Sequence, residues 1–201
     1  MNSKINRDQR TLDVYDAQAA DYADVACAPE SDAQLTAFIA ALAPAARVLD
    51  LGCGPGHAAA FLRDLGFDVT ATDASAEMVG IGRKRFGLDI RVATFSDLSE
   101  TAVYDGILAS FSLLHAPKAE MPTHLAGVHR ALKPGGIFSI SVKTGEGEHR
   151  DTIGRFYAYY SDAEITGLLE HAGFSVSARI TGATEGLDGK LWPWIALTTH
   201  A

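Results

Sequence analysis

The stretch that decides the fold reads Val48-Leu49-Asp50-Leu51-Gly52-Cys53-Gly54-Pro55-Gly56. Its first four residues continue a short apolar segment that begins at Arg47, and such a segment predicts a buried strand. The three glycines that follow at alternate positions permit positive φ and have no Cβ to block a ligand. The pattern therefore predicts a strand, a tight turn whose backbone a ligand can approach closely, and a helix behind it.

Strand and helix patterns alternate on both sides of this turn. We expect seven strands, over residues 47–51, 69–72, 90–93, 104–110, 137–142, 174–180 and 192–199. Alternation of this kind predicts an α/β fold with a mostly parallel sheet and helices on both faces. A short Gly-rich loop, 182–189, joins the last two strands. Such a short connection suits an antiparallel pair, because parallel neighbours need a longer crossover.

Local signals mark where several helices begin and end. Ser31 with Gln34, and Ser161 with Glu164, have the spacing of capping boxes, which predict helix starts. The Lys133-Pro134-Gly135-Gly136 stretch predicts a turn that ends the preceding helix, because proline and glycine interrupt helical structure. Together these signals divide the chain into an N-terminal lid or helical segment, 1–43, and a core, 44–201.

Length and composition limit the class of protein. A chain of 201 residues with 47% hydrophobic content predicts one domain with a sizeable core. The formal net charge is −8, and no basic run exceeds Arg83-Lys84-Arg85. Nucleic-acid binding needs a basic surface, so this composition argues against it and favours a small-molecule partner. No oligomeric state follows from the sequence.

The remaining compositional features concern location and metals. No apolar run reaches the roughly 18 residues of a membrane-spanning helix, and the polar N-terminus, 1–10, lacks a secretory signal. We therefore expect a cytoplasmic protein without a membrane partner. Cys27 and Cys53 form no CxxC pair, so the sequence predicts no metal site, and a reducing compartment argues against a disulfide between them.

Two features of the glycine turn argue against a dinucleotide site. The dinucleotide pattern is GxGxxG, but here the third glycine arrives one residue early and His57 holds its place. Asp50 at the strand end would repel a pyrophosphate. A cationic sulfonium cofactor with a free ammonium group has the opposite preference, and Asp50 fits it.

Val48 to Gly56 resembles motif I of the class I S-adenosylmethionine-dependent methyltransferases, with Asp50, Gly52, Gly54 and Gly56 matching the E/DxGxGxG form. The resemblance extends over nearly the whole chain, through Tyr15 and Tyr22 in a lid region and the segments 73–78, 104–110 and 132–136. It implies a Rossmann-like seven-stranded sheet with an antiparallel last strand, and S-adenosyl-L-methionine as cofactor. The cofactor-binding residues that it implies are Tyr15, Tyr22, Asp50, Gly52, Cys53, Gly54, Gly56, Asp73, Ala74, Met78, Thr94, Phe95 and Ser110.

Three of these positions leave alternatives open. Asp73 ends the second strand, where a carboxylate can accept both ribose hydroxyls, but it could instead cap the next helix. Met78 could lie against the adenine or pack in the core. The family often has an acidic residue after strand three, whereas this sequence has Thr94, with Asp97 three residues later. Either Asp97 reaches back to the adenine, or Thr94 and the backbone near Phe95 contact it.

The acceptor side is expected at the carboxyl ends of strands four and five. The candidates are Ser112, His115, Lys143 and Arg150. His115 titrates in a useful range, so it could act as a general base, donate a hydrogen bond to the acceptor, or cap a turn. Tyr157 is expected as a wall or core residue, and Trp192 and Trp194 are expected to pack in the core.

The sequence supports one leading function and two alternatives. The leading reading is an enzyme that transfers a methyl group from S-adenosylmethionine to an oxygen, nitrogen or sulfur atom of a small molecule. An NAD-dependent oxidoreductase is the second reading, although His57 in place of the third glycine opposes it. The third is a cofactor-binding regulatory or partner protein without turnover, because the family has no universal catalytic residue.

Overall fold

The computed structural model describes residues 8–24 and 29–201, and its centre is a seven-stranded sheet. The strand order is β3-β2-β1-β4-β5-β9-β8, with β9 antiparallel to both of its neighbours and the other described pairs parallel. This arrangement confirms the α/β fold with an antiparallel last strand. The strands are β1 Arg47–Leu51, β2 Asp68–Asp73, β3 Ile90–Val92, β4 Tyr104–Ala109, β5 Leu132–Lys143, β8 Ser175–Glu185 and β9 Leu191–His200.

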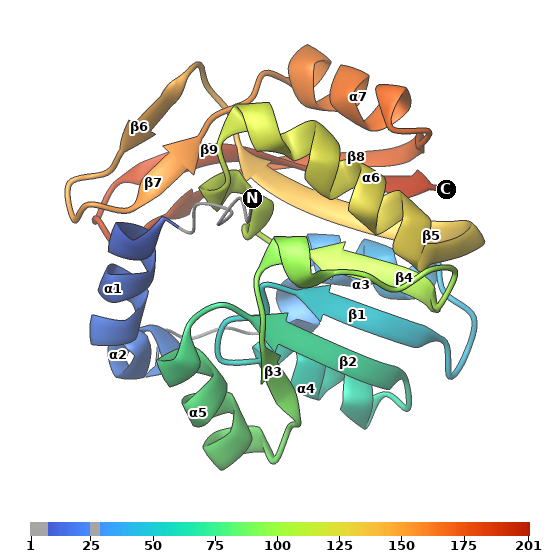
Figure 1. The fold of residues 1–201 in the computed structure, drawn as a ribbon, viewed down its shortest axis with the longest axis horizontal. Coiled ribbons are helices and arrows are strands. Elements are labelled where there is room, and N and C mark those ends of the chain that lie inside the picture. Colours follow the sequence, from blue (N-terminus) through green and yellow to red (C-terminus); the bar gives the residue numbers. More distant parts are fainter. Residues whose placement is uncertain (1–7, 25–28) are drawn as a thin grey trace, which may run out of the picture.

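Helices cover both faces of the sheet, as the alternating pattern predicts. On one face lie α3 Ala33–Ala40, α4 His57–Asp64 and α5 Ala76–Phe86; on the other lie α6 Met121–Ala131 and α7 Asp162–His171. In Figure 1, α6 and α7 lie in front of the sheet and α3 and α4 behind it. Short 3₁₀ helices fill four of the connections, namely η1 Pro29–Ser31, η2 Phe95–Asp97, η3 Leu113–His115 and η4 Lys118–Glu120.

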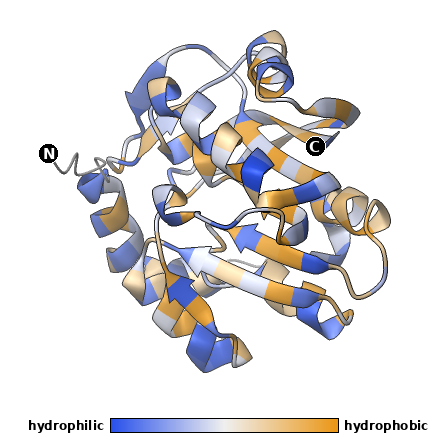
Figure 2. Ribbon diagram, turned by 45° about the vertical axis from the view of Figure 1, so that its right-hand side comes forward, coloured by the Kyte–Doolittle hydropathy of each residue, from blue (hydrophilic) through white to orange (hydrophobic). Residues whose placement is uncertain are grey.

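The central strands are buried on both sides, and this explains their apolar runs. Val48, Leu49 and Leu51 of β1 and Ile107 and Leu108 of β4 are all almost completely inaccessible to solvent. A strand covered by helices on both faces loses the alternation of polar and apolar residues that a half-exposed strand shows. Hydrophobic residues accordingly concentrate in the middle of the sheet (Figure 2).

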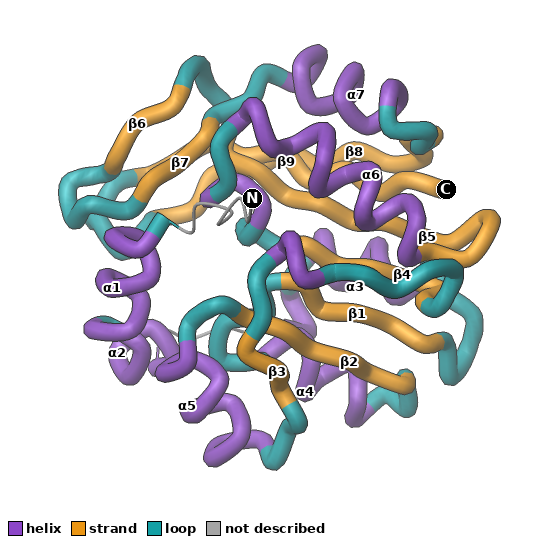
Figure 3. The backbone as a smooth tube through the Cα atoms, viewed as in Figure 1, coloured by secondary structure: helices purple, strands orange, loops and turns teal. Residues whose placement is uncertain are grey.

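The carboxyl ends of the parallel strands meet at one edge of the sheet, where the loops after β1, β2 and β4 gather (Figure 3). Open α/β sheets bind ligands at this edge. Two helices of the N-terminal segment, α1 Gln9–Ala17 and α2 Ala19–Asp24, lie against it and contact α5. A two-stranded sheet of β6 Glu148–Arg150 and β7 Phe156–Ala158 stands beside α1.

Of the local predictions, one helix cap differs from the structure, one is confirmed, and two short strands were missed. Asp32, and not Ser31, caps α3 by accepting the Leu35 N–H at 3.0 Å, whereas buried Gln34 donates to Ser139. The Ser161 cap of α7 is confirmed, since its hydroxyl accepts the Glu164 N–H at 3.1 Å. The short strands β6 and β7 lie in the polar stretch after β5 and carry no apolar alternation strong enough to predict them.

The stretch 133–136 belongs to β5 and is not a free turn. Helix α6 ends at Ala131, and the strand pairing shifts register between Tyr104 and Gly106. Gly135 has φ +75°, so the glycines produce a local break in the pairing within β5 and do not form a separate turn. No helix of the described residues is long and apolar enough to cross a membrane. Cys27 lies outside the described residues.

Candidate active site

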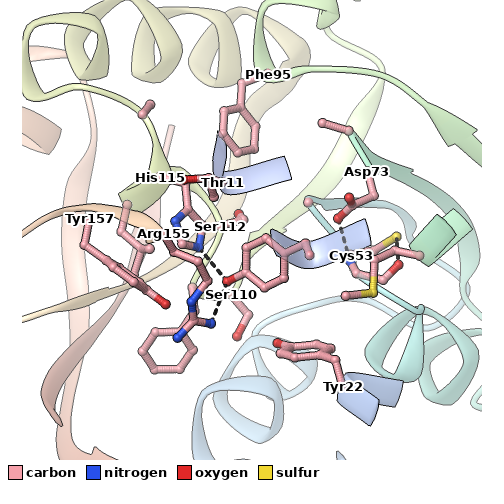
Figure 4. Close-up of a pocket in the computed structure, with 18 of the residues that line it drawn as sticks. Thr11, Tyr22, Cys53, Asp73, Phe95, Ser110, Ser112, His115, Arg155 and Tyr157 are labelled. Carbon is pink, nitrogen blue, oxygen red and sulfur yellow. Dashed lines mark hydrogen bonds between the residues drawn. The ribbon is translucent and has the colours of Figure 1, made fainter. Parts of the chain in front are cut away.

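A cavity of about 660 Å³ opens at the carboxyl edge of the sheet, beneath α1 and α2. We divide it by the elements that line it. The turn half consists of residues from the loops after β1, β2, β3 and β4, namely Asp50, Gly52 to Pro55, Asp73, Ala74, Met78, Thr94 to Ser96 and Ser110. The hairpin half consists of His115, Lys143, Arg155, Tyr157, Thr184 to Leu187, Trp192 and Trp194. Figure 4 shows Cys53 and Asp73 on one side and His115, Arg155 and Tyr157 on the other.

The glycine turn brings bare backbone to the cavity. Gly52 has φ +76°, and a Cβ there would lie 2.4 Å from the Ser112 Cβ. Gly54 has φ +54° and donates its N–H to an Asp73 carboxylate oxygen at 2.7 Å. Gly56 does not line the cavity: its φ is +87°, and a Cβ would lie 2.8 Å from Leu88. The positive φ favours a glycine at the start of α4, and a role of Gly56 as a cofactor contact stays a prediction.

Asp73 is held by the backbone at the end of β2. Its second oxygen accepts the Ser75 N–H at 2.8 Å, and burial raises its pKa. The capping alternative for Asp73 is wrong, because the Ser75 hydroxyl caps α5 by accepting the Met78 N–H at 3.1 Å. The Asp73 carboxylate therefore faces the cavity with a fixed orientation.

Asp50 is the most unusual group of the turn half. It is 2% exposed, and its Oδ2 has no hydrogen-bond partner among the described residues. Burial, with the nearby Asp73 charge, raises the pKa of Asp50 to about 7. A buried carboxylate without a partner is costly unless a ligand supplies one. The turn half therefore offers a site for a cationic group.

The acidic residue after β3 does not reach the cavity. Asp97 accepts hydrogen bonds from the Thr94 N–H at 2.8 Å and from the Thr94 hydroxyl at 2.7 Å, closing η2. Thr94, Phe95 and Ser96 line the cavity instead. Of the two alternatives that the sequence left open, the geometry favours Thr94 and its neighbours over Asp97. Met78 is buried and also lines the cavity, so its two readings are compatible.

Helix α1, which carries Tyr15, meets the loop after β4 at His115. The His115 Nδ1 lies 2.7 Å from the Phe156 carbonyl, which only accepts, so Nδ1 carries the proton. Nε2 then accepts the Tyr15 hydroxyl at 2.9 Å, and Arg155 donates to the same hydroxyl at 3.2 Å. Burial lowers the pKa of His115 to about 4. His115 is therefore a neutral ring whose one lone pair is already engaged.

Two buried cations lie in the hairpin half. Lys143 is 7% exposed, and its Nζ has no hydrogen-bond partner among the described residues. The Nζ lies 3.7 Å from the centre of the Tyr157 ring and 4.5 Å from that of Trp192. Burial, together with the Arg155 charge, lowers the pKa of Lys143 to about 8. A positive, apolar recess is the result.

Arg155 is a site residue that the sequence analysis missed. It is 3% exposed, donates from Nε to Asp151 at 2.9 Å, and lies over the rings of Tyr15 and Tyr157. The signal that could have found it is an arginine four residues after an aspartate, a spacing that allows an ion pair in a compact loop. Trp192 and Trp194 also line the cavity, which corrects their expected role as core residues.

Arg150 does not belong to the site. It lies on the exposed strand β6, makes two 2.9 Å hydrogen bonds to Asp8 and donates to the Gly154 carbonyl at 2.8 Å. Its role is to fasten the start of α1, so the prediction that it faces an acceptor is wrong. Apart from Gly56 and Arg150, every site residue predicted from the sequence lines the cavity, including Tyr15, Tyr22 and Ser112. The Ser112 hydroxyl donates to the Leu51 carbonyl at 2.6 Å, which fixes the loop after β4 against the glycine turn.

Comparison with known proteins agrees with this geometry. Residues 48–136 match the methyltransferase domain family. The chain is 35% identical over 106 residues to an uncharacterized methyltransferase of Synechocystis, covering 50% of this chain and 48% of that protein. It is 36% identical over 104 residues to a ubiquinone biosynthesis O-methyltransferase of Xanthomonas oryzae, covering 48% and 42%. The chain thus spans less than half the length of these two relatives.

Solved structures resemble the whole chain. A Burkholderia thailandensis 1,6-didemethyltoxoflavin-N1-methyltransferase, solved with 1,6-didemethyltoxoflavin and S-adenosylhomocysteine, matches with a TM-score of 0.72 and 25% identity. The match covers 100% of this chain and 92% of that one. An S-adenosylmethionine-dependent methyltransferase of Mesorhizobium loti shares the fold, with a TM-score of 0.66 and 19% identity, over 87% of this chain and 100% of that one. Residues 48–136 therefore match a methyltransferase domain, and the chain has the fold of the class I S-adenosylmethionine-dependent methyltransferases, which confirms the resemblance seen in its sequence.

Proposed function

We propose that this chain, with its class I methyltransferase domain, transfers a methyl group from S-adenosylmethionine to an oxygen, nitrogen or sulfur atom of a small molecule. The observation that carries the proposal is the buried Asp50 carboxylate beside the glycine turn, whose Oδ2 has no hydrogen-bond partner among the described residues. The hairpin half of the same cavity offers separate room for an acceptor. The cavity volume of about 660 Å³ lies within the usual range for small-molecule sites.

The residues of the turn half fit the cofactor. Asp50 offers an oxygen to an ammonium group, and the backbone of Gly52 and Gly54 lines the cavity beside it. Asp73 presents a carboxylate, already oriented by two backbone N–H groups, to ribose hydroxyls. Thr94, Phe95 and Met78 supply the wall for the adenine.

The bound cofactor supplies an activated methyl group on a sulfonium, so the protein needs to position the acceptor and exclude water. Tyr15 and Tyr22 of the lid lie over the cavity with their rings edge to face, 5.8 Å apart. The Tyr15 hydroxyl is tied to His115 and Arg155, which links the lid to the hairpin half. Closure of this region separates the reacting groups from solvent.

A small acceptor suits the shape and charge of the protein better than a macromolecule does. The formal net charge is −8, which opposes nucleic acid, and lid residues cover the cavity. We place the reaction in the cytoplasm, as the sequence predicts. The oxidoreductase alternative is not favoured, because Asp50 would face a dinucleotide pyrophosphate at the glycine turn and His57 stands where the GxGxxG pattern has its third glycine.

Calorimetry tests the cofactor half of the proposal. S-adenosylmethionine and S-adenosylhomocysteine should both bind the purified chain, and NAD should not. Binding of NAD without either sulfur ligand would overturn the proposal.

A screen of small-molecule acceptors, with S-adenosylhomocysteine release as the readout, tests turnover. We expect release that depends on the acceptor added. A chain that binds the cofactor tightly and releases no S-adenosylhomocysteine across a broad panel would instead support the non-catalytic partner protein.

A further inference from the structure

The Lys143 ammonium of the hairpin half is buried, but its neighbours do not supply a group that neutralises its charge. It is buried at the end of β5, yet no carboxylate of the described residues lies within ion-pair distance of its Nζ. Asp151 is bonded to Arg155, and Asp188 accepts the Trp192 indole N–H at 3.1 Å. Both acids are thus engaged elsewhere, although their charges still act on Lys143 at longer range.

Aromatic rings define the shape of the space around this ammonium. Tyr157 and Trp192 contact Lys143 through their faces, and Trp194 packs edge to face against Phe111, 5.8 Å away. Arg155 adds a second buried cation beside Tyr157. Flat apolar walls with positive charge suit a flat ring that carries negative charge.

A purely structural role explains Lys143 less well. The cation–π contacts with Tyr157 and Trp192 stabilise a charge only partly against the loss of water. A lysine that served packing alone would place its ammonium in solvent and bury only its stem. Here the ammonium itself is enclosed, and it lines the cavity.

We infer that the methyl acceptor is a planar aromatic or heteroaromatic small molecule that binds as an anion, with its negative charge on Lys143 and its ring among Tyr157, Trp192 and Trp194. This inference rests on the proposed function. Where the charged atom is also the one that is methylated, the acceptor has no proton to lose, and His115 need not act as a base.

The test uses a matched pair of probes, 3-nitrobenzoate and its neutral analogue 3-nitrobenzamide. Both of the chain's tryptophans, Trp192 and Trp194, line the hairpin half, so quenching of tryptophan fluorescence reports binding there. Each probe is titrated into full-length protein saturated with S-adenosylhomocysteine. Calorimetry of S-adenosylhomocysteine on the same samples checks the turn half independently.

We expect the benzoate to bind about ten- to hundredfold more tightly than the amide, as a charge-assisted hydrogen bond predicts. Lys143→Met should abolish this preference while S-adenosylhomocysteine binding stays unchanged. Lys143→Arg should retain the preference. Lys190→Met removes the same charge from an exposed position on the β8–β9 connection and should behave like the wild type.

Equal affinity for the two probes in the wild-type protein, or a preference that survives in Lys143→Met, would overturn the inference. Failure of S-adenosylhomocysteine to bind the wild-type protein would instead overturn the proposed function. Retained S-adenosylhomocysteine binding in each variant shows that the variant is folded, so a lost preference is assigned to the side chain.

Discussion

The two halves of the cavity bury charges of opposite sign. The turn half contains the Asp50 and Asp73 carboxylates, and the hairpin half contains the Lys143 ammonium and the Arg155 guanidinium. Each half contains a buried charged atom without a hydrogen-bond partner among the described residues, Asp50 Oδ2 on one side and Lys143 Nζ on the other. Isolated buried charges are costly to a fold, so their presence in the same cavity indicates ligands that neutralise them.

The comparison separates two ways in which this site is built. The charges of the turn half come from strand ends and are oriented by backbone N–H groups, as for Asp73. Those of the hairpin half are set among side chains, as for Arg155, which contacts Asp151, Tyr15 and Tyr157. The turn half can therefore be rigid before ligand binds, whereas the hairpin half depends on the lid and on the connection after β5.

Asp50→Asn provides the strongest test of whether the turn half binds the cofactor through a buried negative charge. It should weaken S-adenosylhomocysteine binding by about 3 kcal/mol, or more than a hundredfold, because the ligand's ammonium would lose its buried partner. Wild-type affinity should rise as the pH increases through about 7, since the ionised carboxylate binds the cation. Calorimetry across pH 5.5 to 8.5 measures both effects.

The pH dependence should be absent in Asp50→Asn. Asp68→Asn, at the opposite and exposed end of β2, is the matched control and should retain wild-type affinity and pH dependence. Wild-type affinity of Asp50→Asn for S-adenosylhomocysteine would show that the buried negative charge of the turn half does not contribute to cofactor binding.

His115→Ala tests whether methyl transfer to an acceptor in the hairpin half needs a general base. We expect turnover to fall by no more than about tenfold, mainly through acceptor KM, because His115 holds Tyr15 and has a pKa of about 4. Tyr15→Phe should produce a similar change. Steady-state kinetics with an acceptor from the screen measure kcat and KM separately.

His171→Ala, on the exposed end of α7, serves as the control for loss of an imidazole. A loss of about 10²–10⁴-fold in kcat for His115→Ala would mark a general base. The acceptor would then bind with its proton, and the charge comparison would lose its functional meaning.

Lys143→Met should produce the smallest effect, a rise in the melting temperature of the ligand-free protein. The folded-state pKa of about 8 lies below the usual value for lysine, so at neutral pH the charged side chain destabilises the fold. Its replacement should raise Tm by about 2–6 °C in a domain of this size. Differential scanning calorimetry at pH 7 tests the sign.

The gain should be complete below pH 8 and should diminish as the pH rises toward the unfolded-state pKa of about 10.4, because lysine loses its charge in both states there. Lys190→Met should leave Tm nearly unchanged. A Lys143→Met protein that melts at a lower temperature would show that the ammonium supports the fold.

Sequence patterns were sufficient where function depends on backbone geometry close to a strand end. The glycines, the acids Asp50 and Asp73, and the residues after β3 and β4 all occupy positions that the order of strands fixes along the sheet edge. Alternation of strands and helices therefore predicted the sheet and most of the turn half. The prediction failed at Arg150, where a neighbour from elsewhere in the chain, Asp8, decides the role.

Local patterns were enough to predict the class of fold, the cofactor turn and the two acids, because a parallel sheet places the ends of its strands at one edge whatever the loops contain. Folding was needed to show that Arg155 and both tryptophans line the cavity, and that the Lys143 ammonium has no hydrogen-bond partner in the described part of the chain. It also decided that His115 is a neutral partner of Tyr15, 100 residues earlier in the chain. Burial and pairing depend on residues far apart in the sequence, and no local pattern records which of them meet.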